Sequence, residues 1–565
     1  MAPGKVVVSA VSVVLVVGVA LAVVAVVNVQ NQKKEEVGGH AISSQTKIVE
    51  SICSATNYKS SCQDSLKTVA TNSSADFKDY VKAAMLATMD QVSKSMNLTS
   101  SLLIEADKSS NPKLRMSLED CNDLLSFAID QLQASFSMVG ESATHTLQER
   151  VSELKSWLSS VITYAETCID GVPEPKIQDK MKDTLRNASA LTDNALAIVS
   201  GLSQILEAFG LKIDAKPLNG RRLLSNNDGF PTWVSASDRK LLQAGTEKVV
   251  PQAVVAKDGS GQYKTIAAAL AAYPKTGLTG RYIIYVKAGV YDEYITVDKS
   301  MANVFMYGDG PTKTVVTGSK SVAKGLTTLR SASFAVEGPG FLCKEMGFEN
   351  TAGPEGHQAV ALRVMAEMAV FHNCQMDGYQ DTLYALSGRQ FYSQCVISGT
   401  VDFIFGDSPC VIQNSQIVLR RPMDGQLNAV TAQGRREQHQ PSGIVLHNCN
   451  IVPEPKLVAE RLTIKSYLGR PWREFSRTVV IESTISDAIQ PAGWVAWEGT
   501  FGLDTLYYAE YGNTGPGAKT DNRVTWKGFH VISKTEAAQF TPGPFLDAEK
   551  WIKTTGVPFQ TSLIH

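Results

Sequence analysis

Two aspartates, Asp381 and Asp402, have the residue type and the spacing for acid–base and nucleophilic chemistry. Asp402 lies in a nearly continuous apolar stretch from Val401 to Phe405, so its carboxylate must be turned outward or paired. The two positions are 21 residues apart. A fold that stacks one coil over that length would place both on one face, about 5 Å from each other. Two carboxyl groups so close cannot both ionise cheaply, so one can hold a proton while the other is a nucleophile.

Four further side chains could lie on the same face as these aspartates. Gln358 precedes Gln380 by 22 residues, so the two amides could converge on an oxyanion. Arg470 could hold a carboxylate through its guanidinium, and Trp472 offers a flat apolar face of the kind on which sugars stack. Each residue alone has a structural explanation, since Gln and Asp cap turns, Arg pairs on surfaces and Trp packs. Their joint occurrence at this spacing favours a functional site.

The elements that must position these residues are short β-strands. After Pro251, runs of Val, Ile, Phe, Tyr and Thr are punctuated by Gly and Asn, which indicates β structure. Recurring segments end at Asn350, Asn373, Gln394 and Asn414, in steps of 23, 21 and 20 residues, and a step of 34 to Asn448 leaves room for a loop. This period predicts a parallel β-helix. A β-sandwich is the alternative, although its turn signals would come about every 8–12 residues.

The preceding residues, 40–215, have a helical pattern. Apolar side chains recur in steps of three and four from Leu118 to Val139 and from Leu154 to Cys168, which predicts amphipathic helices in an antiparallel bundle. In an oxidising compartment the natural disulfides join Cys53 to Cys62 and Cys121 to Cys168. Free buried thiols are the alternative, and the missing His/Cys spacing disfavours zinc.

The N-terminus, residues 1–32, predicts a membrane signal. No charged residue occurs from Val6 to Val29, a length that spans a bilayer, so a signal-anchor is favoured over a cleaved signal peptide. The extreme N-terminal position disfavours a buried strand or core helix. Both membrane interpretations send the chain into the secretory pathway, and three sequons agree with this: Asn72, Asn97 and Asn187.

Residues 216–250 read as an exposed linker, rich in Asn, Gly, Ser and Asp. The linker contains one tetrapeptide form twice, which favours proteolytic processing over two solvated charge pairs. The two copies are Arg221, Arg222, Leu223 and Leu224, and Arg239, Lys240, Leu241 and Leu242.

Composition limits the partners of the chain. The 565 residues are 44% hydrophobic, and 54 Lys+Arg against 55 Asp+Glu give a formal net charge of -1. Such a balance gives no support to nucleic-acid binding through bulk charge. Two or more domains are expected at this length.

Two family resemblances follow from these motifs. Residues 40–215 resemble the invertase and pectin methylesterase inhibitor family, whose four-helix bundle carries two disulfides in this order. Residues from about 251 to 555 closely resemble the plant pectin methylesterases, or pectinesterases, through five motifs in family order. These are Val286-Lys-Ala-Gly-Val-Tyr-Asp-Glu293, Gly356-His-Gln-Ala-Val-Ala-Leu362, Asp377-Gly-Tyr-Gln-Asp-Thr-Leu383, Gly399-Thr-Val-Asp-Phe-Ile-Phe-Gly406 and Leu468-Gly-Arg-Pro-Trp472.

The resemblance implies a fold and a set of roles. It implies an all-α four-helix pro-region followed, over residues 251–565, by a right-handed parallel β-helix that is a carboxylic ester hydrolase. Asp402 would attack the C6 methyl ester of galacturonate, and Asp381 would be the general acid and base. Gln380 and Gln358 would stabilise the oxyanion, and Arg470 would orient Asp402. Trp472 and Thr317 would contact the polymer, with no metal and no cofactor.

The resemblance also implies partners and a location. The substrate would be methyl-esterified homogalacturonan in the cell wall. The protein partners would be the chain's own pro-region, which would inhibit until a subtilisin-like protease cuts the linker, and a proteinaceous pectin methylesterase inhibitor. Two other functions compete: a wall protein that only grips pectin, and a calcium-dependent pectate lyase. The chain has no Gly-x-Ser-x-Gly, so an α/β-hydrolase mechanism is not the basis of the esterase prediction.

One position departs from the family pattern. The family commonly pairs the cysteine at Cys395 with a cysteine about 20 residues later, where this chain has Ser415. An odd number of cysteines remains in the second half, so at least one thiol there is unpaired within the region. They are Cys343, Cys374, Cys395, Cys410 and Cys449.

Overall fold

The computed structural model describes residues 39–109, 111–202 and 250–565. The N-terminal apolar segment (1–32) and the part of the linker that carries both basic tetrapeptides lie outside the described residues. Within the described ranges, no helix is both long and apolar enough to cross a membrane.

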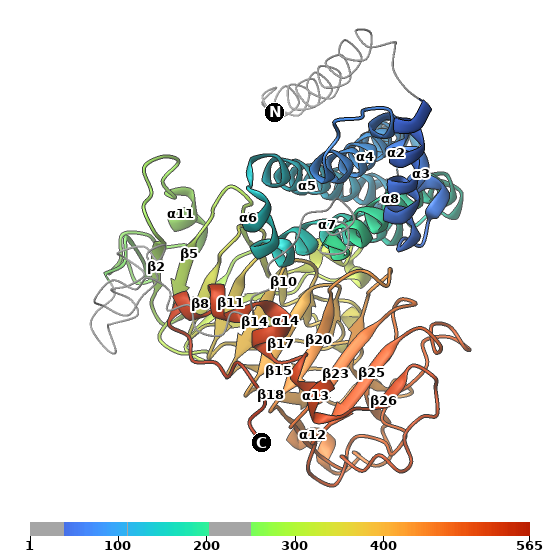
Figure 1. The fold of residues 1–565 in the computed structure, drawn as a ribbon. Coiled ribbons are helices and arrows are strands. Elements are labelled where there is room, and N and C mark those ends of the chain that lie inside the picture. The colour runs from blue at the N-terminus through green and yellow to red at the C-terminus, as the bar shows by residue number, and fades with distance from the viewer. Residues whose placement is uncertain (1–38, 110, 203–249) are drawn as a thin grey trace, which may run out of the picture.

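The described residues between 39 and 202 are helical (Figure 1). Four long helices, α4, α5, α7 and α8, pack against one another in a ring of contacts, so the predicted bundle is confirmed. In α5, Asn111 caps the N-terminus by accepting a hydrogen bond from the Leu114 amide at 3.1 Å, and the stripe that begins at Leu118 is buried. The helices are α2 (Gly39–Ser54), α3 (Lys59–Ala70), α4 (Phe77–Ser109), α5 (Pro112–Glu141), α6 (Thr144–Glu149), α7 (Val151–Gly171) and α8 (Pro175–Ser200).

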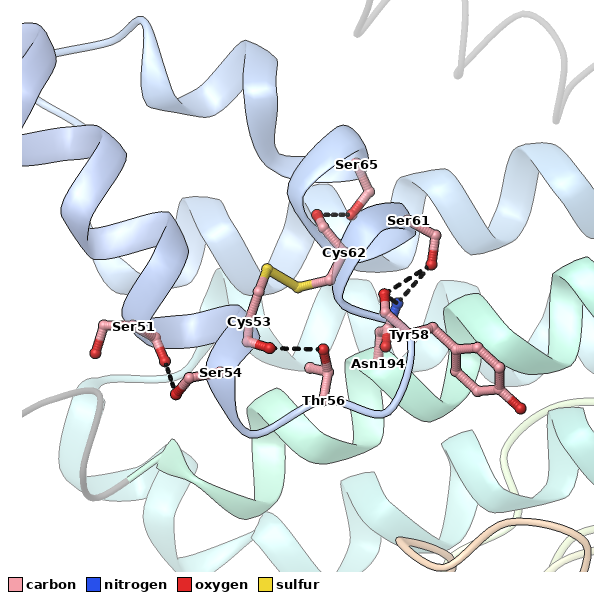
Figure 2. Close-up of a disulfide and its surroundings, with 9 residues drawn as sticks. All are labelled: Ser51, Cys53, Ser54, Thr56, Tyr58, Ser61, Cys62, Ser65 and Asn194. Carbon is pink, nitrogen blue, oxygen red and sulfur yellow. Dashed lines mark hydrogen bonds between the residues drawn. A yellow bond between two sulfur atoms is a disulfide. The ribbon is translucent and has the colours of Figure 1, made fainter.

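Both predicted disulfides are present. Cys121–Cys168 joins α5 to α7, and Cys53–Cys62 joins α2 to α3 (Figure 2). The α2–α3 hairpin is also tied to the bundle, because the side-chain amide of Asn194 in α8 donates to the Tyr58 carbonyl at 3.1 Å. The pro-region is therefore cross-linked within itself at two places.

Residues 250–565 form three parallel sheets that share one core. The predicted parallel β-helix is therefore confirmed, and the alternative β-sandwich is wrong. The 11-stranded sheet contains, in spatial order, β1 (Ala253–Val255), β2 (Tyr282–Val286), β5 (Val304–Tyr307), β8 (Leu342–Lys344), β11 (Ala369–His372), β14 (Gln390–Ser393), β17 (Pro409–Gln413), β20 (Gly443–His447), β23 (Arg477–Ile481), β25 (Tyr507–Tyr511) and β26 (Phe529–Val531).

The other two sheets complete each coil. The seven-stranded sheet contains β22 (Ser466–Gly469), β19 (Asn428–Gln433), β16 (Ile404–Gly406), β13 (Leu383–Ala385), β10 (Leu362–Val364), β7 (Phe334–Val336) and β4 (Ile295–Val297). The eight-stranded sheet contains β24 (Thr484–Ile485), β21 (Asn450–Pro453), β18 (Gln416–Leu419), β15 (Val396–Gly399), β12 (Gln375–Asp377), β9 (Gly347–Asn350), β6 (Thr314–Gly318) and β3 (Gly289–Asp292).

Short helices lie at the ends and edges of the β-helix. Those after β26 cover the outer face of the 11-stranded sheet, where Leu546 and Trp551 are buried against it. The helices are α11 (Ile266–Ala271), α12 (Pro455–Val458), α13 (Lys534–Ala538), α14 (Pro542–Leu546), α15 (Ala548–Trp551), η1 (Val322–Lys324), η2 (Leu329–Ser331), η3 (Pro354–Gly356) and η4 (Lys553–Thr555).

A column of left-handed residues marks one corner of the coils. Strand register stacks Asn373, Gln394, Asn414 and Asn448 on one another, and each has a positive φ between 49° and 54°. Asparagine suits this conformation because its short polar side chain tolerates it. The predicted steps of 21, 20 and 34 residues are therefore real coil lengths.

The first predicted step, from Asn350 to Asn373, was wrong. Asn350 ends β9 in the eight-stranded sheet, whereas the residue below Asn373 in the corner column is Glu345, with φ of 59°. Gly347–Asn350 resembles the later segments in sequence but lies on a different side of the coil. A short run that ends near an Asn occurs on both sides of the coil, so this signal cannot distinguish them.

The five cysteines of residues 250–565 are all buried and unbonded. Cys374 lies against Cys343, with 3.8 Å between their sulfur atoms. Ser415 does lie one coil from Cys395, since its hydroxyl accepts a hydrogen bond from the Cys395 amide at 3.0 Å. Serine thus satisfies the backbone at this position.

The helical bundle packs on the outer face of the seven-stranded sheet (Figure 1). One apolar cluster contains the interior of the bundle together with residues of the β-helix. The β-helix residues in it are Val360, Met365, Tyr384, Leu386, Phe405 and Ala432. The two halves are therefore joined by a continuous hydrophobic interface.

Candidate active site

Asp381 and Asp402 occupy equivalent places on adjacent coils. Each lies two residues before a strand of the seven-stranded sheet, and the register pairs Leu383 with Ile404. The Asp381 amide donates to the Val401 carbonyl at 3.1 Å, which continues this stacking into the turn. The two aspartates are thus one strand spacing apart, as their sequence separation predicts.

The backbone of both aspartates is in the left-handed region. Asp381 has φ of 64° and Asp402 has φ of 52°. Such conformations cost free energy in residues other than glycine and cluster at functional sites. The turns hold these carboxylates in defined positions.

Arg470 follows β22 and binds Asp402 with two hydrogen bonds. Its Nε donates to Oδ1 at 2.7 Å and its Nη2 donates to Oδ2 at 2.6 Å. The guanidinium also lies over the Trp497 ring, 4.3 Å from its centroid. Both contacts fix the plane of the Asp402 carboxylate.

Burial acts on the two aspartates differently. Asp381 is 6% exposed, and burial, reinforced by the charge of Asp402 and opposed by Arg470, raises its pKa well above the ordinary value. Burial also raises the pKa of Asp402, but here the hydrogen bonds and charge of Arg470 oppose it directly. Asp402 is therefore the more acidic member of the pair, and Asp381 is the member that holds a proton.

The remaining predicted polar residues line the same cavity, which has a volume of about 450 Å³. The Ala359 amide donates to the Gln380 carbonyl at 3.2 Å, just as the Asp381 amide donates to the Val401 carbonyl, so Gln358 and Gln380 occupy matching positions on adjacent coils. The cavity brings together Gln358, Gln380, Asp381, Asp402, Arg470 and Trp472. Two amides, two carboxyls and one guanidinium thus face a common space.

Three aromatic residues of the cavity wall escaped the sequence analysis: Tyr384, Phe405 and Trp497. Tyr384 and Phe405 stack with 4.1 Å between ring centroids, and Trp472 packs against Phe405 at 6.0 Å. A signal for the first two was present, because each follows its aspartate by three residues. Trp497 is distant in sequence and carries no such signal.

Thr317 is not brought to this cavity. It lies on β6 in the eight-stranded sheet, where its hydroxyl donates to Glu349 at 3.0 Å. The structure therefore gives no positional support to its predicted contact with the polymer.

Across the described ranges of the chain, no group of three or more His, Cys, Asp or Glu side chains is placed to hold a metal ion.

The helical bundle forms the opposite wall of the cavity that contains the two aspartates. Residues of α5 and of the C-terminal end of α7 line it together with the aspartates, among them Asp120, Leu124, Thr167 and Asp170. Asp170 accepts a hydrogen bond from Arg473, three residues after Arg470. The helical bundle therefore lies directly over Asp381, Asp402 and Arg470.

Buried polar contacts hold the bundle in this place. Thr163 donates to Asp407 at 2.7 Å, and Ser156 donates to Glu367 at 2.7 Å. Toward the α2–α3 hairpin, Tyr58 donates to Glu437 at 2.8 Å and Nδ1 of His439 lies 2.9 Å from Asp193. These partners are on the β-helix, so the interface combines apolar packing with specific hydrogen bonds.

Comparison with known proteins agrees with this architecture. The Pectinesterase family model matches residues 252–549, and the model for Plant invertase/pectin methylesterase inhibitor matches residues 47–198. A probable pectinesterase/pectinesterase inhibitor of Brassica napus is 43% identical and covers 100% of both chains. Pectinesterase 4 of Arabidopsis thaliana is 41% identical over 99% of this chain and 100% of its own.

A solved structure matches the β-helix. Pectin methylesterase from carrot is 50% identical with a TM-score of 0.55, and the match covers 56% of this chain and 100% of the carrot chain. The β-helix therefore corresponds to the whole of the solved carrot chain. Taken with the two family models, this places the chain in the plant pectinesterase/pectinesterase inhibitor family of pectin methylesterases, with an N-terminal inhibitor domain and a C-terminal pectinesterase domain.

Proposed function

We propose that the β-helix hydrolyses the C6 methyl esters of homogalacturonan with Asp402 as nucleophile and Asp381 as general acid and base. The observation that carries the proposal is the pairing of stacked aspartates with a guanidinium bound to only one of them. This arrangement gives the two aspartates different pKa values, as a nucleophile beside a proton donor requires.

In the first half of the reaction, a carboxylate oxygen of Asp402 attacks the ester carbonyl carbon. The carbonyl electron pair moves onto oxygen, and the side-chain amides of Gln358 and Gln380 donate hydrogen bonds to that oxyanion. The bond to the methoxy group then breaks, and the proton of Asp381 goes to the departing oxygen to give methanol. The product is an anhydride between Asp402 and the galacturonate.

In the second half, water attacks the same carbon. Asp381, now ionised, takes one proton from that water, and the bond to Asp402 breaks. The galacturonate leaves as a free acid and Asp402 is again a carboxylate. The aromatic wall formed by Tyr384, Phe405, Trp472 and Trp497 supplies an apolar face for the sugar rings.

We expect the enzyme that begins at Val250 to release methanol from methyl-esterified pectin in the presence of a chelator. The reaction needs no ion, because the charges that form are matched by Arg470 and the two amides. Methanol release and the absorbance of unsaturated chain ends are measured together. Unsaturated ends that vanish with chelator would indicate a lyase, and pectin binding without methanol would indicate a wall-binding protein.

We further propose that the bundle inhibits the enzyme until the linker is cut. In the uncut chain α5 and α7 occupy the wall of the catalytic cavity where a polymer would lie. The two basic tetrapeptides at Arg221 and Arg239 are the proposed cleavage sites for a subtilisin-like protease. We also propose that the chain is secreted to the cell wall and that residues 1–32 anchor it. Exposed positions of Asn72, Asn97 and Asn187 suit glycosylation in that pathway.

The affinity of the bundle for the β-helix is expected to fall as pH rises. Burial raises the pKa of Asp407 to about 6. Burial, and next the charge of Asp193 in the bundle, raises the pKa of Glu437 to about 7, with Glu166 adding to this and Arg436 opposing it. Docking thus favours the protonated carboxyls, so it is strongest below their ordinary pKa and is lost as pH rises through about 6 to 7.

The measurement is the dissociation constant of the cut bundle from the enzyme between about pH 5 and about pH 8, where we expect an increase of about tenfold or more. Glu437→Gln should flatten this dependence, because glutamine cannot titrate. A constant affinity over this range in the unaltered protein would contradict the assignment.

A further inference from the structure

Helix α5 places a carboxylate of the pro-region against the β-helix, beside the catalytic cavity. Asp120 is 6% exposed, and both of its oxygens are bound by β-helix residues. Oδ2 accepts a hydrogen bond from the Thr327 hydroxyl at 2.6 Å, and Oδ1 accepts one from Nε of Arg330. Arg330 also donates to Glu119 at 3.1 Å through Nη2. Thr327 and Arg330 therefore form a built carboxylate-binding site.

This carboxylate-binding site lies on the path of a polymer that reaches the aspartates. Asp120 lines the catalytic cavity and also a neighbouring cavity of about 470 Å³, and Leu124 and Leu329 are likewise shared by both. Together the two cavities form one groove. The carboxylate-binding site stands where they meet.

The neighbouring cavity is lined by cations of the β-helix: Lys299, Lys320, Arg330 and Arg363. Arg363 on β10 is 8% exposed; its Nη2 donates to Glu337 at 2.8 Å, and its Nε has no hydrogen-bond partner among the described residues. A buried guanidinium N–H without an acceptor costs free energy unless an anion accepts its hydrogen bond. The four cations outnumber the two β-helix carboxylates that line the same cavity, Asp298 and Glu337, so this section of the groove favours negative charge.

Helix α5 supplies such charges in the uncut chain. Asp120, Asp123 and Asp130 recur at helical spacing on the side that faces the groove, and Asp130 pairs with Lys299. The pro-region thus presents a row of carboxylates to the cationic section of the groove.

We infer that Thr327 and Arg330 bind the free carboxylate of a demethylated galacturonate in the released enzyme, at a fixed distance from the ester under attack. This inference rests on the proposed function. Asp120 then occupies the place of that carboxylate in the precursor. A methyl ester has no charge for the guanidinium, so this position distinguishes demethylated from methylated units.

The test uses the released enzyme from Val250 on, the part that corresponds to the complete carrot chain. Its substrates are a fully methyl-esterified pectin and the same pectin partly demethylated at random by base. We expect kcat/KM per ester to be about tenfold higher for the second. Arg330→Gln should raise KM for the partly demethylated pectin about tenfold, with kcat and the values for the esterified pectin changed less than about twofold.

Two further measurements separate binding from folding. Unesterified trigalacturonate should inhibit the wild-type enzyme competitively, with an inhibition constant about tenfold weaker in Arg330→Gln and also weakened in Thr327→Val. Arg461→Gln is the matched control, because Arg461 is similarly exposed, pairs with Asp487 and lines neither cavity. It should behave as wild type.

The outcomes are distinct. If Arg330→Gln keeps the wild-type preference and inhibition constant, the carboxylate-binding site is refuted while the esterase assignment stands. If the wild-type enzyme releases no methanol from either pectin, the proposed function fails and this inference with it.

Discussion

Replacing Asp402 by alanine is expected to lower methanol release by at least about 10⁴-fold, because the group that forms the covalent intermediate is removed. The two hydrogen bonds from Arg470 disappear at the same time, and a partly buried guanidinium is left without its partner. Initial rates of methanol release from methyl-esterified pectin by the released enzyme measure the effect.

Controls must separate lost chemistry from lost structure. Asp402→Asn keeps the shape and its amide oxygen can still accept one of the two hydrogen bonds from Arg470, so it should be equally inactive with a smaller loss of thermal stability than Asp402→Ala. Asp424→Ala removes an exposed carboxylate that pairs with Arg421 and should leave the rate unchanged. Turnover by Asp402→Ala within tenfold of wild type would refute the nucleophile assignment.

The uncut precursor is expected to be at least about 100-fold less active than the enzyme released from it, because the bundle fills the approach to the aspartates in nearly every molecule. Replacing Arg221, Arg222, Arg239 and Lys240 by alanine should preserve the uncut form during secretion. A specific protease site placed in the linker of that variant then allows cleavage on demand. Methanol release before and after cleavage is the measurement.

A variant of the interface tests whether docking itself causes the inhibition. Thr163→Glu places a carboxylate against buried Asp407, where Thr163 now donates a hydrogen bond at 2.7 Å, and should activate the uncut chain by displacing the bundle. Thr71→Glu changes an exposed position of the bundle in the same way and should not. Equal activities of the cut and uncut chains would remove autoinhibition while leaving a role in folding.

The parts of the fold that depend on short sequence distances were predictable. Asp381 and Asp402 meet because one coil separates them, and the same local period revealed the corner residues Asn373, Gln394 and Asn414. The two disulfides followed from helical spacing and compartment. In each case the relevant contact lies within one or two elements of the residue that signals it.

The parts that depend on long distances were not predictable. Thr163 and Asp407 are 244 residues apart, and nothing near either of them indicates the other. Trp497 reaches the cavity through its packing on Arg470, which periodicity cannot show. Asn350 was assigned to the wrong side of the coil because a short run that ends near an Asn occurs in more than one sheet.

The corner column has a consequence for how such solenoids diversify. The column fixes one corner of the coils that it joins, so additional residues must form loops at other places in a coil. This is the case in the longer coil from Asn414 to Asn448. That coil includes His439 and Gln440, which touch Asp193 and Ser159 of the bundle. A longer or shorter loop here changes the affinity of the β-helix for the pro-region. The coils that carry Asp381 and Asp402 stay in register. Control and chemistry can therefore evolve independently on a single scaffold.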